Sequence, residues 1–520
     1  MTWLTMGDIL RVNAKKFPDK IAVKDEKRSM TFKELNERAC RLANAMRTLG
    51  LRQGDRVAVL LYNKVEYMEI YAACAKAGII CATINFRFIG KEVKYIIEDS
   101  GSRLMFVGSE FLKLSDEVKP DLPQVQYIVQ VDGITCEGYL CYEDLIERAS
   151  PRGPNLHVNP KEPWLLLYTS GTTGKPKGVV RTHESYIAFF LINQVEFGYQ
   201  HDDIGLIAMP MFHVNSTFYS FVFTYLGASV YIHRAHLFDP ENILKTIDEE
   251  KITFTSLVPT HYTMMLNLPE EVKAKFDLTS IRSLLCSSAP VRKDTKLAIM
   301  EMFPDVRLFE AYGSTEAGLV TTLRPEDQMT KLGSIGRECI GSDSILLLDD
   351  KGQEVEVGKV GEIWSRSPMM FDRYWGMPEK TRQCIRLDGY FSAGDMAKKD
   401  EDGYFSIVDR KDNMIITGGE HVYPNEVEAV ICTHPKVMDV AIIGVPDDKW
   451  GEAVHAAIIL KPGMSMRDRT IIDYCKGKMA GYKKPKGVWF LEPDEMPRTA
   501  TGKIRHRSLR KRILKRIEER

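Results

Sequence analysis

The chain has 520 residues, 44% hydrophobic and 27% charged, which is an ordinary globular composition but more length than one hydrophobic core organises. Lysine plus arginine and aspartate plus glutamate both number 71, so the formal net charge is zero and no whole-protein field indicates a nucleic-acid partner. The 10 cysteines form no Cys-x-x-Cys pair, and no apolar run reaches the about 18 residues of a membrane span. We therefore expect free thiols, no transmembrane segment and a cytoplasmic protein.

The first zone, to about residue 160, alternates helical and strand patterns. Thr31 and Glu34 have capping-box spacing ahead of a long amphipathic stretch, which predicts a helix. Residues 56–61 are strand-like, and a second helix is expected through residues 67–71. This alternation predicts an α/β layer.

A phosphate-handling loop follows the apolar run at residues 164–167. Glycines at 171, 174 and 178 let backbone N–H groups approach an anion, while hydroxyls and two lysines add donors and charge. The loop is not a P-loop of the kinase type, because Pro176 follows Lys175 and opposes helical continuation. The residues assigned to the polyphosphate are Thr169, Ser170, Gly171, Thr172, Thr173, Gly174, Lys175 and Lys177.

The middle zone repeats apolar strands, at residues 254–258 and 281–286, which end just before polar motifs. Open α/β sheets bind ligands at the carboxyl ends of their strands, so these motifs are expected to line a site. A β-rich section comes next, with a strand and turn over residues 346–353 and a strand over 360–364.

From about residue 412 the pattern predicts a compact βαβ-like unit, with a helix over residues 425–430 and strands over 440–443 and 455–459. Leu509, Ile513 and Ile517 have helical spacing in the basic C-terminal segment. We expect this helix to pack on its own domain, with contact to a membrane surface as the alternative.

Seven motifs resemble, in order, the signatures of the adenylate-forming superfamily, which includes acyl-CoA synthetases, peptide-synthetase adenylation domains and luciferases. The resemblance spans essentially the whole chain, and its motifs are the phosphate loop, residues 210–213, 288–290, 312–316, 390–395, 409–412 with the loop 418–424, and 497–503. It implies an α/β multidomain fold, with a large N-terminal AMP-binding domain over residues 1–411 and a small mobile C-terminal lid over 412–520. The large domain would contain two α/β sheet subdomains and a distorted β-barrel.

The resemblance also implies roles for single residues. Lys503 would be the catalytic lysine, Glu316 the magnesium ligand with Thr315 near the phosphate, His213 a wall of the acyl pocket and Asp412 the interdomain hinge. The alternatives without a functional role are a solvated lysine for Lys503 and a packed or hydrogen-bonded histidine for His213. For Asp395 and Arg410 the alternative is a structural ion pair. The remaining assignments are Ser288, Ala289, Pro290 and Tyr312 to adenine, Asp395 and Arg410 to the ribose, and Gly418 and Gly419 to the path of CoA.

The implied activity is that of an acid–CoA ligase using ATP, Mg²⁺ and CoA. The partners are then small molecules, and a medium- or long-chain fatty acid is the favoured substrate because residues 422–426 look most like fatty acyl-CoA synthetases. Aryl acids, carnitine-like or betaine-type acids, and loading of a carrier protein instead of CoA remain alternatives. A nucleotide-binding module without turnover is disfavoured, because a sensor needs no moving catalytic lysine.

Overall fold

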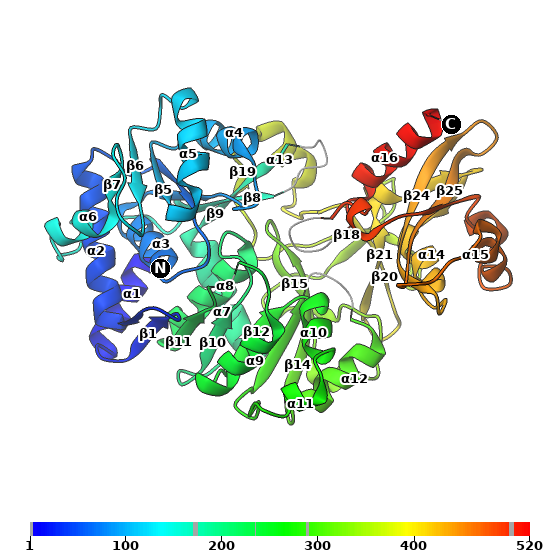
Figure 1. Cartoon of the computed structure of the whole chain (residues 1–520), viewed down its shortest axis with the longest axis horizontal. Helices are drawn as coiled ribbons and strands as arrows, with labels where there is room; N and C mark the ends of the chain where they lie inside the picture. Colours follow the sequence, from blue (N-terminus) through cyan, green and yellow to red (C-terminus); the bar gives the residue numbers. More distant parts are fainter. Residues whose placement is uncertain (1–3, 170–174, 235, 288–290, 499–503, 520) are drawn as a thin grey trace. The chain divides into compact units, whose positions relative to one another are not determined.

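The computed structural model describes residues 4–169, 175–234, 236–287, 291–498 and 504–519 (Figure 1). The chain divides into two compact units. Unit 1 comprises Met1–Ser344 and Ser365–Phe391, and unit 2 comprises Ile345–Trp364 and Ser392–Arg520. The division expected at residues 411 and 412 stays a prediction.

One sheet of unit 1 carries the strand ends that were expected to line a site. Its strand order within the described residues is β16-β15-β14-β13-β12-β10-β11-β1-β2, parallel from β14 to β1 and antiparallel at both edges. The strands are β1 (Ile21–Lys24), β2 (Ser29–Thr31), β10 (Ile204–Ile207), β11 (Ser229–Ile232), β12 (Phe254–Leu257), β13 (Ser283–Ser287), β14 (Arg307–Ser314), β15 (Gly318–Leu323) and β16 (Arg337–Glu338).

The other sheet of unit 1, again among the described residues, has the order β19-β9-β8-β4-β3-β5-β6-β7. It is parallel from β8 to β7, whereas β8, β9 and β19 pair antiparallel. The strands are β3 (Arg56–Leu60), β4 (Ile80–Thr83), β5 (Leu104–Val107), β6 (Tyr127–Gln130), β7 (Leu140–Cys141), β8 (Pro163–Thr169), β9 (Lys177–Thr182) and β19 (Arg373–Tyr374).

Helices join the two sheets of unit 1 through a shared core. Trp164 on β8 is fully buried, donates its indole N–H to the Tyr71 carbonyl at 3.0 Å and packs on Phe221, 4.8 Å between centroids. The same core takes in residues of both sheets. The helices of this unit are α1 (Met6–Lys16), α2 (Phe32–Thr48), α3 (Glu66–Ala77), α4 (Gly90–Ser100), α5 (Leu112–Val118), α6 (Tyr142–Arg148), α7 (His183–Phe197), α8 (Val214–Leu226), α9 (Pro240–Glu249), α10 (Pro259–Leu266), α11 (Glu270–Lys273), α12 (Lys293–Met302) and α13 (Pro378–Cys384).

Unit 2 is built from two sheets in its described residues. The first is antiparallel, in the region expected to hold the barrel, with the order β17 (Leu346–Leu348), β18 (Gly361–Trp364), β20 (Asp395–Lys399) and β21 (Phe405–Arg410). The second comprises β22 (Ile415–Thr417), β23 (Glu420–Val422), β24 (Val437–Asp447), β25 (Gly451–Leu460) and β26 (Gly487–Phe490). Its helices are α14 (Pro424–Ile431), α15 (Asp468–Tyr474) and α16 (His506–Glu518).

The predicted helix start at Thr31 and the predicted packing of the C-terminal helix are confirmed, with one residue exposed. The capping box before α2 is present, because Thr31 Oγ1 accepts from the Glu34 amide and Glu34 accepts from the Thr31 amide. In unit 2, Leu509 and Ile513 of α16 are fully buried against β24 and β25, as expected, whereas Ile517 is 37% exposed. The βαβ-like pattern differs in detail: β24 and β25 form a direct antiparallel pair, and the parallel crossover is β25–α15–β26.

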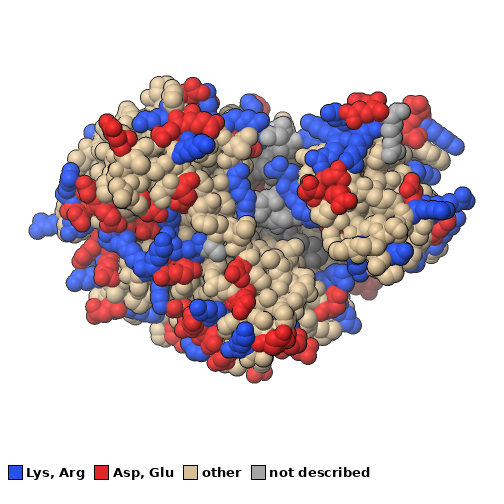
Figure 2. Space-filling view, viewed as in Figure 1, with Lys and Arg blue, Asp and Glu red and all other residues tan. Residues whose placement is uncertain are grey.

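The surface agrees with the balanced composition. Figure 2 shows acidic and basic side chains interspersed over the visible face of unit 1. Among the described residues, no helix combines the length and the apolar character that crossing a membrane demands.

Candidate functional site

The predicted phosphate loop connects two adjacent antiparallel strands. Thr169 at the end of β8 and Lys177 at the start of β9 are partners in register, so the ends of the loop lie side by side. Residues 170–174 lie outside the described residues. Thr169 Oγ1 is buried and has no hydrogen-bond partner in the described part of the chain. A buried hydroxyl of this kind is suited to a ligand oxygen, because leaving it unpaired is costly.

The two lysines of the loop meet aromatic rings. Lys175 Nζ lies 5.4 Å from the centroid of the Tyr95 ring. Lys177 Nζ lies 3.2 Å from the Tyr374 hydroxyl and 4.4 Å from the centroid of its ring. Both lysines assigned to the polyphosphate therefore have an aromatic side chain beside their ammonium groups.

The Tyr312–Glu316 motif forms the turn between β14 and β15. Gly313 is required there, since a Cβ atom on it would lie 2.1 Å from the Gly318 carbonyl oxygen. A register shift between Tyr312 and Gly313 accompanies this close approach. The Ser314 hydroxyl accepts from the Ala317 amide at 2.9 Å. Thr315 and Glu316 thus lie at the tip of a tightly fixed turn.

Long-range contacts hold this tip from the neighbouring sheet. Tyr374 donates its hydroxyl to Glu316 Oε1 at 2.7 Å, and both residues are buried. Arg181 Nη1 donates to the Thr315 carbonyl at 3.0 Å. Tyr374 lies on β19, which pairs with β9. One strand pair therefore supplies Lys177, Arg181 and Tyr374 to the predicted ATP site.

The donor set around Glu316 fits a phosphate-bound magnesium ion. The described residues contain no cluster of three or more histidine, cysteine, aspartate or glutamate side chains that could hold a metal ion. Magnesium needs no such cage, because it is commonly held by one or two carboxylates together with substrate phosphates. Glu316 supplies one carboxylate next to the strands that flank the loop, and phosphate oxygens of the nucleotide would supply further ligands.

The adenine side of the site is partly described. Ser288, Ala289 and Pro290 lie outside the described residues. Ser287, directly before them, pairs with Ala311, so this strand end adjoins the half-buried Tyr312. The adenine assignments themselves stay predictions.

His213 occupies the N-cap position of α8 and is half-buried against Phe212, 4.3 Å between ring centroids. Two residues later, Asn215 Nδ2 lies 2.7 Å from Ser256 Oγ and 3.4 Å from Ser287 Oγ. The first turn of α8 is thereby joined to the carboxyl ends of β12 and β13. This places His213 beside the strand ends where a ligand is expected, and its role in the acyl pocket stays a prediction.

Asp395 and Arg410 face each other within unit 2. They are register partners on β20 and β21, and Arg410 Nε donates to Asp395 Oδ1 at 2.9 Å while Nη2 donates to the Ala393 carbonyl at 2.7 Å. The pair is thus an ion pair in this structure. Ribose binding by these residues remains a prediction. In that role the Arg410 guanidinium would orient the Asp395 carboxylate toward the ribose.

Asp412 is exposed in a short 3-10 turn over Lys411–Asn413, and the residue after it is held because Asn413 Nδ2 donates to Asp409 Oδ1 at 3.1 Å. Before it, the buried Asp409 accepts from the amides of Arg410 and Asn425, and burial raises the pKa of Asp409 against these hydrogen bonds. Lys411 pairs with Glu362 and Asp350, each at 3.0 Å. Asp412 itself lies exposed in this turn, and its role as the pivot stays a prediction.

Gly418 and Gly419 form the turn between β22 and β23 with φ of 60° and 83°, a conformation that favours glycine. A Cβ on Gly418 would lie 3.0 Å from the Trp450 ring, whereas one on Gly419 would meet nothing within 4 Å. The turn geometry explains both glycines, and their part in the path of CoA stays a prediction.

Lys503 lies outside the described residues, as do residues 499–502. The two sides of this segment are joined, since Arg498 bridges to Ile504 and the Arg505 amide donates to the Pro497 carbonyl at 2.8 Å. Arg498 also pairs with Asp439 on β24. His506, which follows directly, lies 2.9 Å from Glu428 Oε1 on α14.

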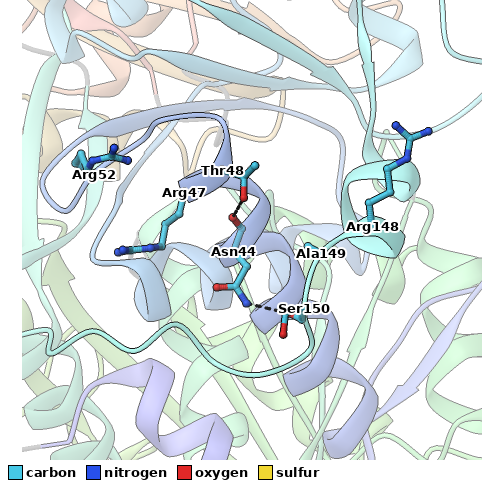
Figure 3. Close-up of a pocket in the computed structure, with 7 residues that line it drawn as sticks. All are labelled: Asn44, Arg47, Thr48, Arg52, Arg148, Ala149 and Ser150. Atoms are coloured by element: carbon cyan, nitrogen blue, oxygen red, sulfur yellow. Dashed lines mark hydrogen bonds between the residues drawn. The ribbon is translucent and has the colours of Figure 1, made fainter.

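A separate surface pocket of about 630 Å³ in unit 1 contains none of the predicted site residues (Figure 3). Figure 3 shows Asn44 bonded to Ser150 across it, with the arginine side chains on separate elements. The pocket is lined by Asn44, Arg47, Thr48, Arg52, Arg148, Ala149 and Ser150.

Sequence reasoning missed Arg181, Tyr374 and Asn215. Arg181 follows Val179 and Val180 in an apolar, strand-like segment. A charged residue in such a segment is a sequence signal that could have identified it as a buried cation. Tyr374 and Asn215 carry no local signal, because their partners are far away in the sequence.

Comparison with known proteins agrees with this arrangement. The model of the family described as AMP-binding enzyme matches residues 10–375, and that of the AMP-binding enzyme C-terminal domain matches residues 426–503. The chain is 35% identical over 502 residues to a feruloyl-CoA synthase of an Amycolatopsis species, covering 96% of this chain and 97% of that protein. It is 34% identical over 484 residues to a long-chain-fatty-acid–CoA ligase of Mycobacterium tuberculosis, covering 91% of each.

Solved structures give the same result. The crystal structure of the anthranilate CoA ligase AuaEII in complex with anthranoyl-AMP matches with a TM-score of 0.88 and 31% identity, covering 98% of each chain. The mixed α/β architecture, the motifs in their order and the two family matches agree over nearly the whole length. The chain therefore belongs to the family of AMP-binding enzymes.

Proposed function

We propose that this protein is an AMP-forming acid–CoA ligase that acts on a medium- or long-chain fatty acid. The observation that carries the proposal is the cluster at the Thr315–Glu316 turn, where Tyr374 holds the buried carboxylate and Lys177 lies at the end of the phosphate-loop hairpin. Family membership and the similarity to two named CoA ligases support the reaction class.

The reaction begins with attack of a carboxylate oxygen on the α-phosphorus of ATP. The bond from that phosphorus to the bridging oxygen breaks, and pyrophosphate leaves with the electron pair. Negative charge builds on the phosphates, so fixed cations and donors lower the barrier. Lys175, Lys177 and Thr169 are the described groups that would bind the phosphates. Magnesium, when bound at Glu316, would neutralise phosphate charge.

The second step uses the acyl-adenylate as an activated ester. The CoA sulfur attacks the carbonyl carbon, the thiol proton is lost, and AMP leaves with the former carboxylate oxygen. We propose that Lys503 serves the first step, in which a flexible point charge can bridge phosphate and carboxylate oxygens. Asp412 would be the pivot between the steps, Asp395 and Arg410 would bind the ribose, and Gly418 and Gly419 would let CoA approach.

The acid is proposed from the similarity to known ligases. Phe218, Phe221 and Phe223 of α8 are buried in the core, so their apolar character does not by itself indicate an acyl pocket. The similarity to a long-chain-fatty-acid–CoA ligase favours a fatty acid. An aryl acid is the second candidate, favoured by the similarity to a feruloyl-CoA synthase and an anthranilate CoA ligase.

The test is an acid panel with purified protein, MgATP and CoA. Short to long aliphatic, aryl and betaine carboxylates are each incubated with and without CoA, and AMP, pyrophosphate and acyl-CoA are measured by mass spectrometry. The proposal predicts AMP and acyl-CoA in equal amounts, greatest for medium or long aliphatic acids. Preference for aryl acids would replace the substrate but keep the reaction. Pyrophosphate without acyl-CoA would indicate another acceptor, such as a carrier protein.

A further inference from the structure

Arg181 is a fully buried cation in the apolar interior of unit 1. Its exposed fraction is 0%, and its guanidinium carbon lies 5.0 Å from the ring centroid of Phe218 and 5.4 Å from that of Tyr186. Burial lowers the pKa of Arg181 to about 10, against the opposing effects of Tyr186 and Glu316. The side chain is therefore still charged at neutral pH, inside an aromatic enclosure.

The contacts of this guanidinium are unusually few. Nη1 donates to the Thr315 carbonyl at 3.0 Å, whereas Nε and Nη2 are buried without a hydrogen-bond partner among the described residues. No carboxylate of the described chain lies within ion-pair distance of it. Two other deeply buried cations behave differently, since Lys64 pairs with Asp132 and Lys296 pairs with Glu310.

Stability alone gives a poor reason for a charge at this position. Removing a guanidinium from water without a paired anion is costly, and even paired buried charges can often be replaced by apolar residues at no loss of stability. Ring contacts with Tyr186 and Phe218 offset part of that cost. What the charge adds is local: it fixes the backbone of Thr315 and lies near the carboxylate of Glu316.

The geometry of β9 directs two cations to the same turn. Lys177 and Arg181 are four residues apart on one strand, so they project from the same face. Tyr374 pairs with Val179 between them and donates to Glu316. The Thr315–Glu316 tip is thus held by a backbone hydrogen bond at Thr315 and a side-chain hydrogen bond at Glu316.

We propose that Arg181 is a positioning residue for the nucleotide: its guanidinium holds the Thr315 carbonyl and supplies a buried positive charge beside Glu316, which presets this turn to bind the phosphates of MgATP. This inference rests on the proposed function, in which the turn meets the phosphates. It adds a residue that contacts neither substrate nor metal but acts through Thr315 and Glu316.

The test compares R181K, R181Q and R181M with the wild-type full chain. Calorimetry measures binding of ATP with magnesium and with a chelator, chemical denaturation measures stability, and thioester formation from a supplied acyl-adenylate measures the second step. We expect R181M to weaken MgATP binding by about tenfold or more, as for loss of a hydrogen bond from a charged donor, without losing stability. R181Q keeps a donor and R181K keeps the charge, so both should bind MgATP more tightly than R181M. Thioester formation should fall less than MgATP binding in all three, because the supplied acyl-adenylate lacks the β- and γ-phosphates.

The control is K64M, which removes a buried cation that has carboxylate partners. It should lose stability but keep MgATP affinity. If R181M instead loses stability and keeps MgATP affinity, or loses both half-reactions equally, Arg181 is only structural and the proposal is overturned. If R181M does not fold, equal MgATP affinity in wild type and R181Q, which lacks the charge, overturns it. MgATP binding is measured without acid or CoA, so the two proposals can fail separately. If no acid in the panel yields acyl-CoA, only the proposed function is refuted. If the wild-type protein does not bind MgATP, both proposals are refuted.

Discussion

Tyr374→Phe removes one hydroxyl from the predicted ATP site and little else. That hydroxyl donates to Glu316 Oε1 at 2.7 Å between two buried residues, and it also lies 3.2 Å from Lys177 Nζ. A hydrogen bond to a charged group contributes about 1.5–3 kcal/mol. If this energy holds the carboxylate in place for MgATP, its loss lowers kcat/KM for MgATP by about 10- to 150-fold, at about 1.4 kcal/mol per factor of ten.

The assay is acid-dependent exchange of labelled pyrophosphate into ATP, which follows adenylation without CoA. It is run across a magnesium titration, and the unfolding free energy of each variant is measured by denaturation. Tyr142→Phe is the matched control, because Tyr142 donates to the buried Glu69 at 2.6 Å elsewhere in unit 1. Both variants should lose about 1–3 kcal/mol of stability, but only Tyr374→Phe should slow exchange.

The reasoning is refuted if Tyr374→Phe loses stability while exchange and its magnesium dependence stay as in the wild type. The Tyr374–Glu316 bond would then be a structural contact like that of Tyr142. Equal slowing in both variants would also refute it, since that effect follows from stability and not from the site.

Three further predictions concern unit 2. Lys503→Ala should abolish adenylation but spare thioester formation from a supplied acyl-adenylate; unchanged pyrophosphate exchange would refute the assignment. Asp412→Pro should leave one half-reaction and cripple the other, and separate assays of the two steps check this, with equal loss indicating misfolding. Burial lowers the pKa of His506. The hydrogen bond to Glu428 and the charge of Glu428 together raise this pKa by more than burial lowers it, so the pKa in the folded protein lies above its ordinary value. The stabilisation is therefore complete below the unfolded pKa of about 6.5 and is lost as pH rises through the folded pKa, and it amounts to about 1.4 kcal/mol for each pH unit between those two pKa values. Denaturation of wild type and His506→Gln from pH 6 upward tests this, and an identical pH dependence in both would contradict it.

Motifs that act through the backbone could be predicted from the sequence. The Thr31–Glu34 spacing specifies a capping box, so this local pattern has one structural solution. The order of the motifs indicated the family, which the comparisons bear out. Chain topology then brought Thr169, Lys177, Thr315 and Glu316 into one unit.

The supporting contacts could not be predicted in this way. Tyr374 and Glu316 are 58 residues apart, and Arg181 and Thr315 are 134 apart, so no local spacing links them. They meet only because β9 pairs with β19 beside the β14–β15 turn. The pairing of Asp395 with Arg410 likewise depends on the register of β20 and β21. Substrate choice is harder still, since the aromatic residues of α8 fill the core.

The most direct test of the central claim follows the oxygen of the acid. A turnover is run with a carboxylic acid labelled with ¹⁸O in both carboxylate positions, MgATP and CoA, and the masses of AMP, pyrophosphate and any inorganic phosphate are measured. Adenylation transfers one carboxylate oxygen to the α-phosphorus, so AMP must carry one labelled oxygen and pyrophosphate none. Label in inorganic phosphate together with ADP, or unlabelled AMP beside acyl-CoA, would contradict the account.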